Sequence, residues 1–124
     1  MAKISVLVDT DIFIDYFNTG RFHALFDSDR FTVCYSAITK KELLTKPGLR
    51  DTERESILAE LNRCRLIALS DSITARYSDL RRWHPSLEKG DALIAATTLV
   101  KHLPLMTRNK RHFQVVNGLA LFGE

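Results

Sequence analysis

The N-terminal segment of this chain constrains its fold more than any other. Residues 4–8 form a nearly continuous apolar run, ISVLV, that stops at Asp9. Such a run is typical of a strand that is buried on both faces of a parallel sheet. Because parallel strands are joined by crossover segments, usually helices, the run predicts an α/β fold.

The rest of the chain alternates between strand-like and helix-like segments. We expect further strands at residues 31–35, 66–69, 103–107 and 119–122, and helices at residues 37–45, 51–65, 71–83 and 92–101. Pro47-Gly48, His84-Pro85 and Gly90-Asp91 are the turn signals between them. This order predicts a three-layer α/β/α sandwich around a parallel sheet of roughly five strands.

Length and composition indicate one soluble globular unit. A chain of 124 residues can bury one core but not two, so we expect residues 1–124 to form a single domain. Hydrophobic residues make up 45% and charged residues 27%, which is ordinary for a globular protein. No apolar run reaches the length of a membrane span, and residues 4–8 are too few for a signal peptide. We therefore expect a cytoplasmic protein.

The cysteines and the net charge are less informative. Cys34 and Cys64 lack the spacing of a zinc or redox motif, so we expect buried or inert thiols. The net charge of +3 is compatible with a polyanionic partner but does not establish one.

Carboxylates at the junctions between segments are the main clue to chemistry. Asp9 and Asp91 each fit a helix N-cap, Asp11 fits a first-turn helix residue, and Glu42 fits a solvated helix position. Strand ends of a parallel sheet meet at one edge, however, and clustered carboxylates repel one another unless a cation neutralises them. Oxygen ligands without cysteine or paired histidine favour Mg²⁺, with Mn²⁺ as a substitute.

The four blocks at residues 8–12, 36–43, 90–97 and 107–109 resemble, in order, the sequence blocks of PIN-domain nucleases. Within that group the chain is most similar to VapC toxins of bacterial toxin–antitoxin systems. The resemblance implies an Mg²⁺-dependent endoribonuclease, a homodimer, and a cognate antitoxin whose tail occupies the active site. It also implies that Asp9, Glu42 and Asp91 hold the metal and, through it, the attacking water, and that Thr10 orients the first acid or the following helix.

The fourth block departs from the fullest family pattern, because Asn109 stands where many members have an aspartate. We therefore expect one firmly held ion and a second that substrate phosphate completes. Thr107 is expected either to contact phosphate or to hold Asn109. Arg108 and Lys110 are candidates for binding the RNA backbone.

Two side chains and two rival functions remain open at this point. His112 is expected to be incidental, and Trp83 to serve packing or a dimer contact. One rival is a haloacid-dehalogenase-like phosphatase with Asp9 as a covalent nucleophile, although this would leave Glu42 without a role. The other is a degenerate PIN module that binds a partner without catalysis.

Overall fold

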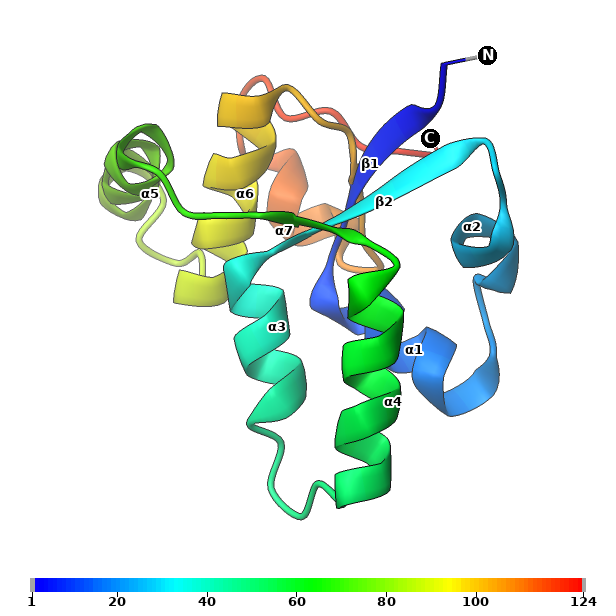
Figure 1. Ribbon diagram of the computed structural model, residues 1–124. Coiled ribbons are helices and arrows are strands. Elements are labelled where there is room, and N and C mark those ends of the chain that lie inside the picture. The colour runs from blue at the N-terminus through cyan, green and yellow to red at the C-terminus, as the bar shows by residue number, and fades with distance from the viewer. Residues whose placement is uncertain (1, 124) are drawn as a thin grey trace.

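A parallel sheet forms the centre of the molecule. The computed structural model describes residues 2–123, and its strands are β1 (Ile4–Val8), β2 (Phe31–Ser36), β3 (Arg65–Ile67) and β4 (Leu105–Met106). They lie in the order β3-β2-β1-β4, and every neighbouring pair is parallel (Figure 1). In the register of the central pair, Val6 is the partner of Val33.

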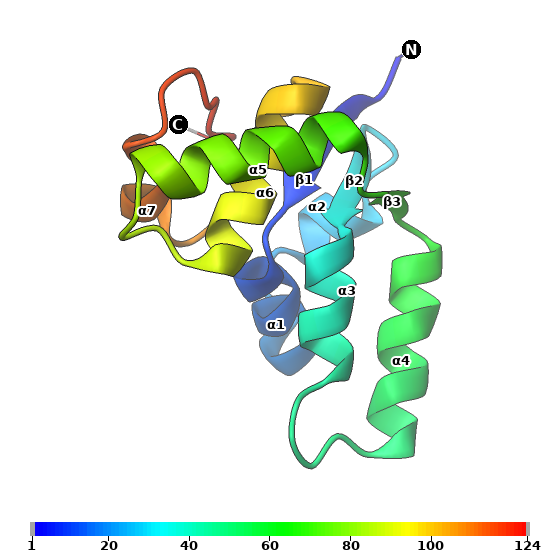
Figure 2. The same cartoon turned by 90° about the vertical axis from the view of Figure 1, so that its left-hand side faces the viewer.

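Helices cover both faces of this sheet. They are α1 (Thr10–Thr19), α2 (His23–Asp27), α3 (Ala37–Leu44), α4 (Asp51–Asn62), α5 (Asp71–Trp83), α6 (Lys89–Lys101) and α7 (Lys110–Gln114). The layer with α5, α6 and α7 faces the viewer in Figure 2. None of the helices in residues 2–123 has the length and apolarity needed to cross a bilayer.

Alternating side chains of the central strands separate the core into two halves. Leu7 and Cys34 face the half built with α5, α6 and α7, while Val6, Val8 and Val33 face the half built with α1, α2, α3 and α4. A strand buried on both sides needs apolar residues at consecutive positions, which is why β1 has no polar face. The three-layer α/β/α architecture predicted from the sequence is confirmed.

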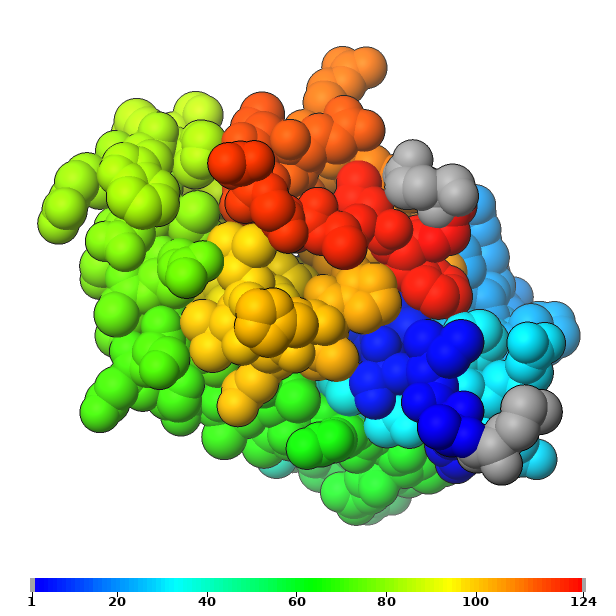
Figure 3. All heavy atoms as spheres, turned by 90° about the horizontal axis from the view of Figure 1, so that it is seen from above, coloured from blue at the N-terminus to red at the C-terminus, as the bar shows by residue number. Residues whose placement is uncertain are grey.

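The strand count is the main correction. Four strands pair in the described residues, and the segment predicted at 119–122 contributes only an isolated parallel bridge between Leu105 and Leu121. Two hydrogen bonds, from Leu105 N to Ala120 O and from Phe122 N to Leu105 O, make this bridge. In Figure 3 this C-terminal segment lies beside the N-terminal strand. Because β4 has two residues, it offers no longer edge on which a fifth strand could extend.

Two helix starts also differ from the prediction. Helix α6 begins at Lys89 with Glu88 as its N-cap, so Asp91 lies within the first turn and is not a cap. Helix α7 begins at Lys110, in a segment for which the sequence predicted no helix. Both differences matter for function, because they fix where Asp91 and the residues after Asn109 point.

The predicted site residues lie at the carboxyl ends of the strands. Helix α1 follows β1 directly and α3 follows β2 directly, so both helices begin at the lower edge of the sheet in Figure 1. Helix α6 begins beside α3, where Gly90 lies against Glu42. Open α/β sheets bind their ligands at this edge.

Candidate active site

Asp9 is the most constrained carboxylate in the molecule. It is the N-cap of α1, is only 3% exposed, and has both oxygens engaged. Its Oδ1 accepts the backbone N–H of Thr10 at 2.8 Å, and its Oδ2 accepts the hydroxyl of Thr107 at 2.7 Å. The capping role expected for Asp9 is therefore present, but the bond from Thr107, 98 residues away, is not part of a helix cap.

The surroundings of Asp9 disfavour a negative charge. Burial, followed by the negative charge of Asp11, raises the pKa of Asp9 from 3.8 to about 7, against the opposing effect of its two hydrogen bonds. The charge of Asp91 makes a smaller contribution to the same increase in the pKa of Asp9, so Asp91 acts on Asp9 electrostatically. A nearby cation would remove the penalty for ionising Asp9.

Glu42 is tied to the end of the first strand through Thr10. The Thr10 hydroxyl donates to Glu42 Oε1 at 2.7 Å and lies 2.9 Å from the hydroxyl of Thr39. Since a hydroxyl carries one hydrogen, Thr39 donates to Thr10 when Thr10 donates to Glu42. Thr39 is fully buried, so this relay fixes an exposed carboxylate to the core. Thr10 orients the second acid through its hydroxyl and the first through its backbone.

Asp91 approaches from the other side of the site. Its Oδ2 lies 3.4 Å from Nδ1 of His112 on α7. Burial raises the pKa of Asp91, while the hydrogen bond and charge of His112 lower it. His112, which we expected to be incidental, is thus the described partner of a predicted site residue.

The fourth sequence block closes the site around Asp11. Asp11 Oδ2 accepts Nδ2 of Asn109 at 3.1 Å and the backbone N–H of Arg108 at 3.3 Å. Thr107 is 4% exposed, and its hydroxyl also accepts the backbone N–H of Asn109 at 3.0 Å. Of the two roles expected for Thr107, holding Asn109 is therefore the one that the structure contains.

The oxygen atoms of these side chains are the ligand type that a hard cation prefers. The side chains do not, however, converge into a closed coordination shell. Within residues 2–123, no three His, Cys, Asp or Glu side chains converge closely enough to form a metal-binding group. Asp11 Oδ1 is nevertheless buried without a hydrogen-bond partner, and burial raises the pKa of Asp11. Mg²⁺ keeps several waters and commonly takes one or two carboxylates plus substrate phosphate. The donor set fits such an ion, whose coordination would be completed by water and substrate phosphate.

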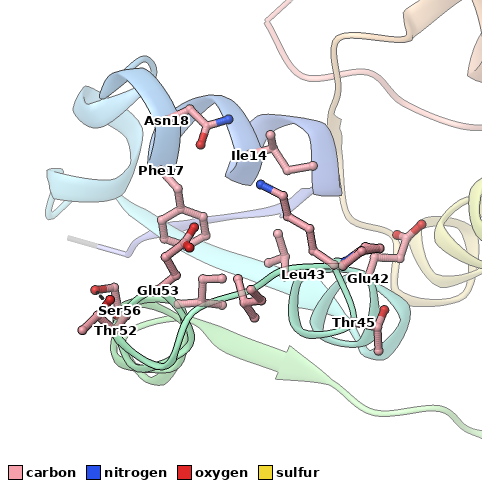
Figure 4. Close-up of a pocket in the computed structure, with 13 residues that line it drawn as sticks. Ile14, Phe17, Asn18, Glu42, Leu43, Thr45, Thr52, Glu53 and Ser56 are labelled. Carbon is pink, nitrogen blue, oxygen red and sulfur yellow. Dashed lines mark hydrogen bonds between the residues drawn. The ribbon is translucent and has the colours of Figure 1, made fainter.

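A largely apolar groove leads away from Glu42. It has a volume of about 670 Å³ and runs between α1 and the α3–α4 hairpin. Ile14 and Phe17 of α1 face Leu43 of α3 across it, and Glu42 lies at one end with its carboxylate turned away (Figure 4). Ile14 is 45% exposed, so the groove presents apolar surface to solvent.

Comparison with known proteins gives a family for this site. The PIN domain family model matches residues 6–119. The chain belongs to the PIN-domain family. Ribonuclease VapC1 of Methanocaldococcus jannaschii is 29% identical over 121 residues, which cover 94% of this chain and 84% of that protein.

Solved structures from toxin–antitoxin systems share the fold of this chain. A toxin–antitoxin complex from Klebsiella pneumoniae matches with a TM-score of 0.71 and 26% identity, covering 93% of this chain and 95% of that one. VapBC-1 from nontypeable Haemophilus influenzae matches the fold with a TM-score of 0.80 and 20% identity, covering 95% and 96%. The PIN-domain and VapC resemblance of the four sequence blocks is thus confirmed.

Among the described residues, hydrogen bonds join five of the predicted site residues of this PIN domain, whereas Asp91 contacts His112 instead. One continuous chain of hydrogen bonds runs from Asn109 through Thr107, Asp9 and Thr10 to Glu42. Arg108 instead directs its guanidinium to Asp15 at 3.0 Å. Lys110 lines a second cavity together with Arg108 and Thr107.

Sequence reasoning missed Thr39 and gave too little weight to Asp11. Thr39 lies three residues before Glu42, a spacing that places two side chains on one face of a helix. Asp11 is in the first turn, as expected, and it is also the residue that Asn109 contacts. The signal available in the sequence was the pairing of an acid in the first block with an amide in the last.

Proposed function

We propose that this PIN domain is a VapC-type endoribonuclease toxin that hydrolyses RNA phosphodiester bonds with the help of Mg²⁺. The observation that carries the proposal is Asp9, which is buried beside Asp11 and Asp91 and is held by Thr107 from the opposite end of the chain. A nearby cation would stabilise the ionised form of a carboxylate whose surroundings otherwise disfavour its charge. The relative named as a ribonuclease supports the choice of RNA as substrate.

Asp9, Glu42 and Asp91 would hold the metal ion. A divalent cation bound there supplies positive charge that stabilises a phosphodiester during hydrolysis. Thr10 and Thr107 are positioning residues, since their hydroxyls fix the carboxylates of Glu42 and Asp9 respectively. Mn²⁺ has the same preference for oxygen ligands and would substitute.

Asn109 supports one firmly bound ion rather than two. Its amide donates to Asp11, so its side chain is oriented within the site, but it adds no negative charge. A second ion would therefore depend on oxygens of the RNA. Thr107, Arg108 and Lys110 line a cavity beside the site and are proposed to contact the RNA.

The apolar groove beside Glu42 is proposed to receive part of a cognate antitoxin. The structures from Klebsiella pneumoniae and Haemophilus influenzae are complexes of this type. Exposed Ile14 and half-buried Phe17 offer apolar contacts, and a chain seated between α1 and α3 would reach Glu42. We propose that the tail of the antitoxin continues from this groove past Glu42 into the acidic site.

Assembly and location are further parts of the proposal. Trp83 is 62% exposed at the end of α5, so packing within this chain is not its role, and a contact with a second copy remains our prediction. We also propose that residues 1–124 act as one domain, as a homodimer, in the cytoplasm.

The test offers the purified protein total RNA or a phosphomonoester, each with Mg²⁺, Mn²⁺ or a chelator. The proposal predicts RNA fragments with either metal, no fragments with the chelator, and no release of phosphate from the monoester. Phosphate release without RNA cleavage would instead favour the phosphatase alternative, although both oxygens of Asp9 accept hydrogen bonds. Inactivity on both would favour the partner-binding PIN module.

A further inference from the structure

A second cavity adjoins the acids on the side of β4. It has a volume of about 380 Å³ and is bordered by Thr107, whose hydroxyl holds Asp9. Its lining combines the basic residues Arg21, Arg108 and Lys110 with apolar residues such as Phe22 and Met106. Partly exposed basic side chains beside a hollow attract anions.

The carboxylate of Asp15 contacts the guanidinium groups of both Arg21 and Arg108 beside this cavity. Asp15 Oδ1 lies 3.0 Å from Nη1 of Arg108, and Asp15 Oδ2 lies 3.7 Å from Nη1 of Arg21. The side chain of Asp15 is 18% exposed, whereas those of Arg21 and Arg108 are 62% and 50% exposed. Asp15 thus orders both arginines while leaving them accessible to a ligand. Lys110 also lines this cavity.

Local backbone geometry fixes Arg21 in place. Phe22 has a φ of 68°, a left-handed conformation that is uncommon for an aromatic residue. Its ring lies under the Arg21 guanidinium, whose Cζ is 4.8 Å from the ring centroid. Strain of this kind persists where surrounding structure enforces it, and here it presents a planar cation at the rim of the cavity.

Arg108 connects the cavity to the acids. Its backbone N–H donates to Asp11, while its guanidinium contacts Asp15. Each guanidinium has five N–H donors, and Asp15 contacts one terminal nitrogen of each. Most donors of both groups therefore remain for a planar or tetrahedral anion.

We propose that Arg21 and Arg108 bind a backbone phosphate of the RNA, next to the phosphate that is cleaved. The inference rests on the proposed function for its choice of RNA, and it adds a binding site to which Arg21 contributes. The role of Asp15 is to orient the two arginines. Phe22 supports Arg21 from below and does not itself contact the phosphate.

The test compares Arg21→Gln with a matched control, Arg30→Gln. Arg30 is also exposed, but it precedes β2 and therefore lies at the opposite end of the sheet from Asp9. Binding of fluorescent single-stranded RNA of random sequence is measured by anisotropy in chelator, at several salt concentrations. Cleavage of total RNA with Mg²⁺ is measured on the same proteins, and thermal unfolding checks that each is folded.

Arg21→Gln should weaken RNA binding roughly tenfold, as expected for loss of one charge-assisted contact. It should also lower the slope of log affinity against log salt by about 0.7, the value for one phosphate on a single strand. Arg21→Lys should keep the salt slope but bind more weakly than wild type, because it keeps the charge and loses the planar fork. Arg30→Gln should match wild type in both measurements.

Equal RNA affinity of Arg21→Gln and Arg30→Gln would overturn the phosphate site. If wild type still cleaved RNA in that case, the proposed function would stand alone. If RNA binding depended on Arg21 but no RNA were cleaved with Mg²⁺, the phosphate site would stand and the nuclease assignment would fail.

Discussion

Replacing Asp9 by asparagine should stabilise the metal-free protein, even though it should abolish activity. Asp9 is 3% exposed and its pKa is raised to about 7 from an ordinary value of 3.8, mainly by burial. The folded state therefore binds the Asp9 proton more tightly than the unfolded state. By linkage, this group lowers the stability of the fold progressively as pH rises from about 4 to about 7, and the loss is constant above that.

The size of the effect follows from the two pKa values. Their separation of about 3 pH units, at about 1.4 kcal/mol each, gives a penalty of about 4 kcal/mol at pH 8. Asparagine removes the charge but weakens the bonds from Thr10 and Thr107, which costs about 1 kcal/mol. Asp9→Asn should therefore be more stable by about 3 kcal/mol at pH 8, equivalent to roughly 10 °C in Tm for a domain of this size.

Urea unfolding in chelator, at several values between pH 4 and pH 8, measures this difference directly. The gain in Asp9→Asn should be smallest at pH 4 and largest at pH 8. Asp29→Asn, which removes an exposed carboxylate, is the control and should change the free energy of unfolding by less than about 0.5 kcal/mol at each pH. A difference between Asp9→Asn and wild type that did not vary with pH would refute the reasoning.

Three further substitutions test other parts of the account. Thr10→Val should lower kcat for RNA cleavage roughly tenfold, because it loses the hydroxyl that donates to Glu42. Thr10→Ser keeps this hydroxyl and should retain most of the activity. Equal rates in wild type and both variants would show that this hydrogen bond has no part in the mechanism. Ile14→Glu should prevent co-purification with a co-expressed antitoxin, because the exposed Ile14 side chain lines the groove. RNA cleavage should be unchanged, since Ile14 lies outside the hydrogen-bonded site. If the variant still co-purified with the antitoxin, the antitoxin would bind elsewhere. Tyr16→Phe should lower the free energy of unfolding by about 1–2 kcal/mol, because buried Glu60 then loses a hydrogen bond of 2.6 Å. Chemical denaturation measures this change. Unchanged stability would show that the ion pair with Arg63 is sufficient for Glu60.

The parts of the fold that depend on local pattern could be predicted from the sequence. The ISVLV run of β1 and the cap at Asp9 are local features, and both are where the sequence placed them. The segment at 119–122 has the composition of a strand but finds only one residue to pair with. Its state depends on the length of β4, which is a property of the assembled sheet.

The candidate site shows the same division. The order of the sequence blocks predicts Asp9, Glu42 and Asp91 as site residues; Asp9 ends a strand, Asp91 lies in the first turn of a helix, and Glu42 lies within one. Other contacts join residues that are more than 90 positions apart in the sequence. Thr107 donates a hydrogen bond to Asp9, and Arg108 donates one to Asp15. No periodicity within a single chain reports such pairs, so the orientation of the basic residues needed the structure.

The acids are the central claim, and Mg²⁺-dependent RNA cleavage by wild type and by Asp91→Asn tests it most directly. Asp91 has its side chain beside His112 in the first turn of α6, so the isosteric change should leave the fold intact. Wild type should cleave RNA with Mg²⁺ and stop when chelator is added, and Asp91→Asn should be at least a hundredfold slower, roughly the loss expected for a metal-site group. Cleavage by Asp91→Asn at the wild-type rate, or cleavage that persists in chelator, would contradict the account.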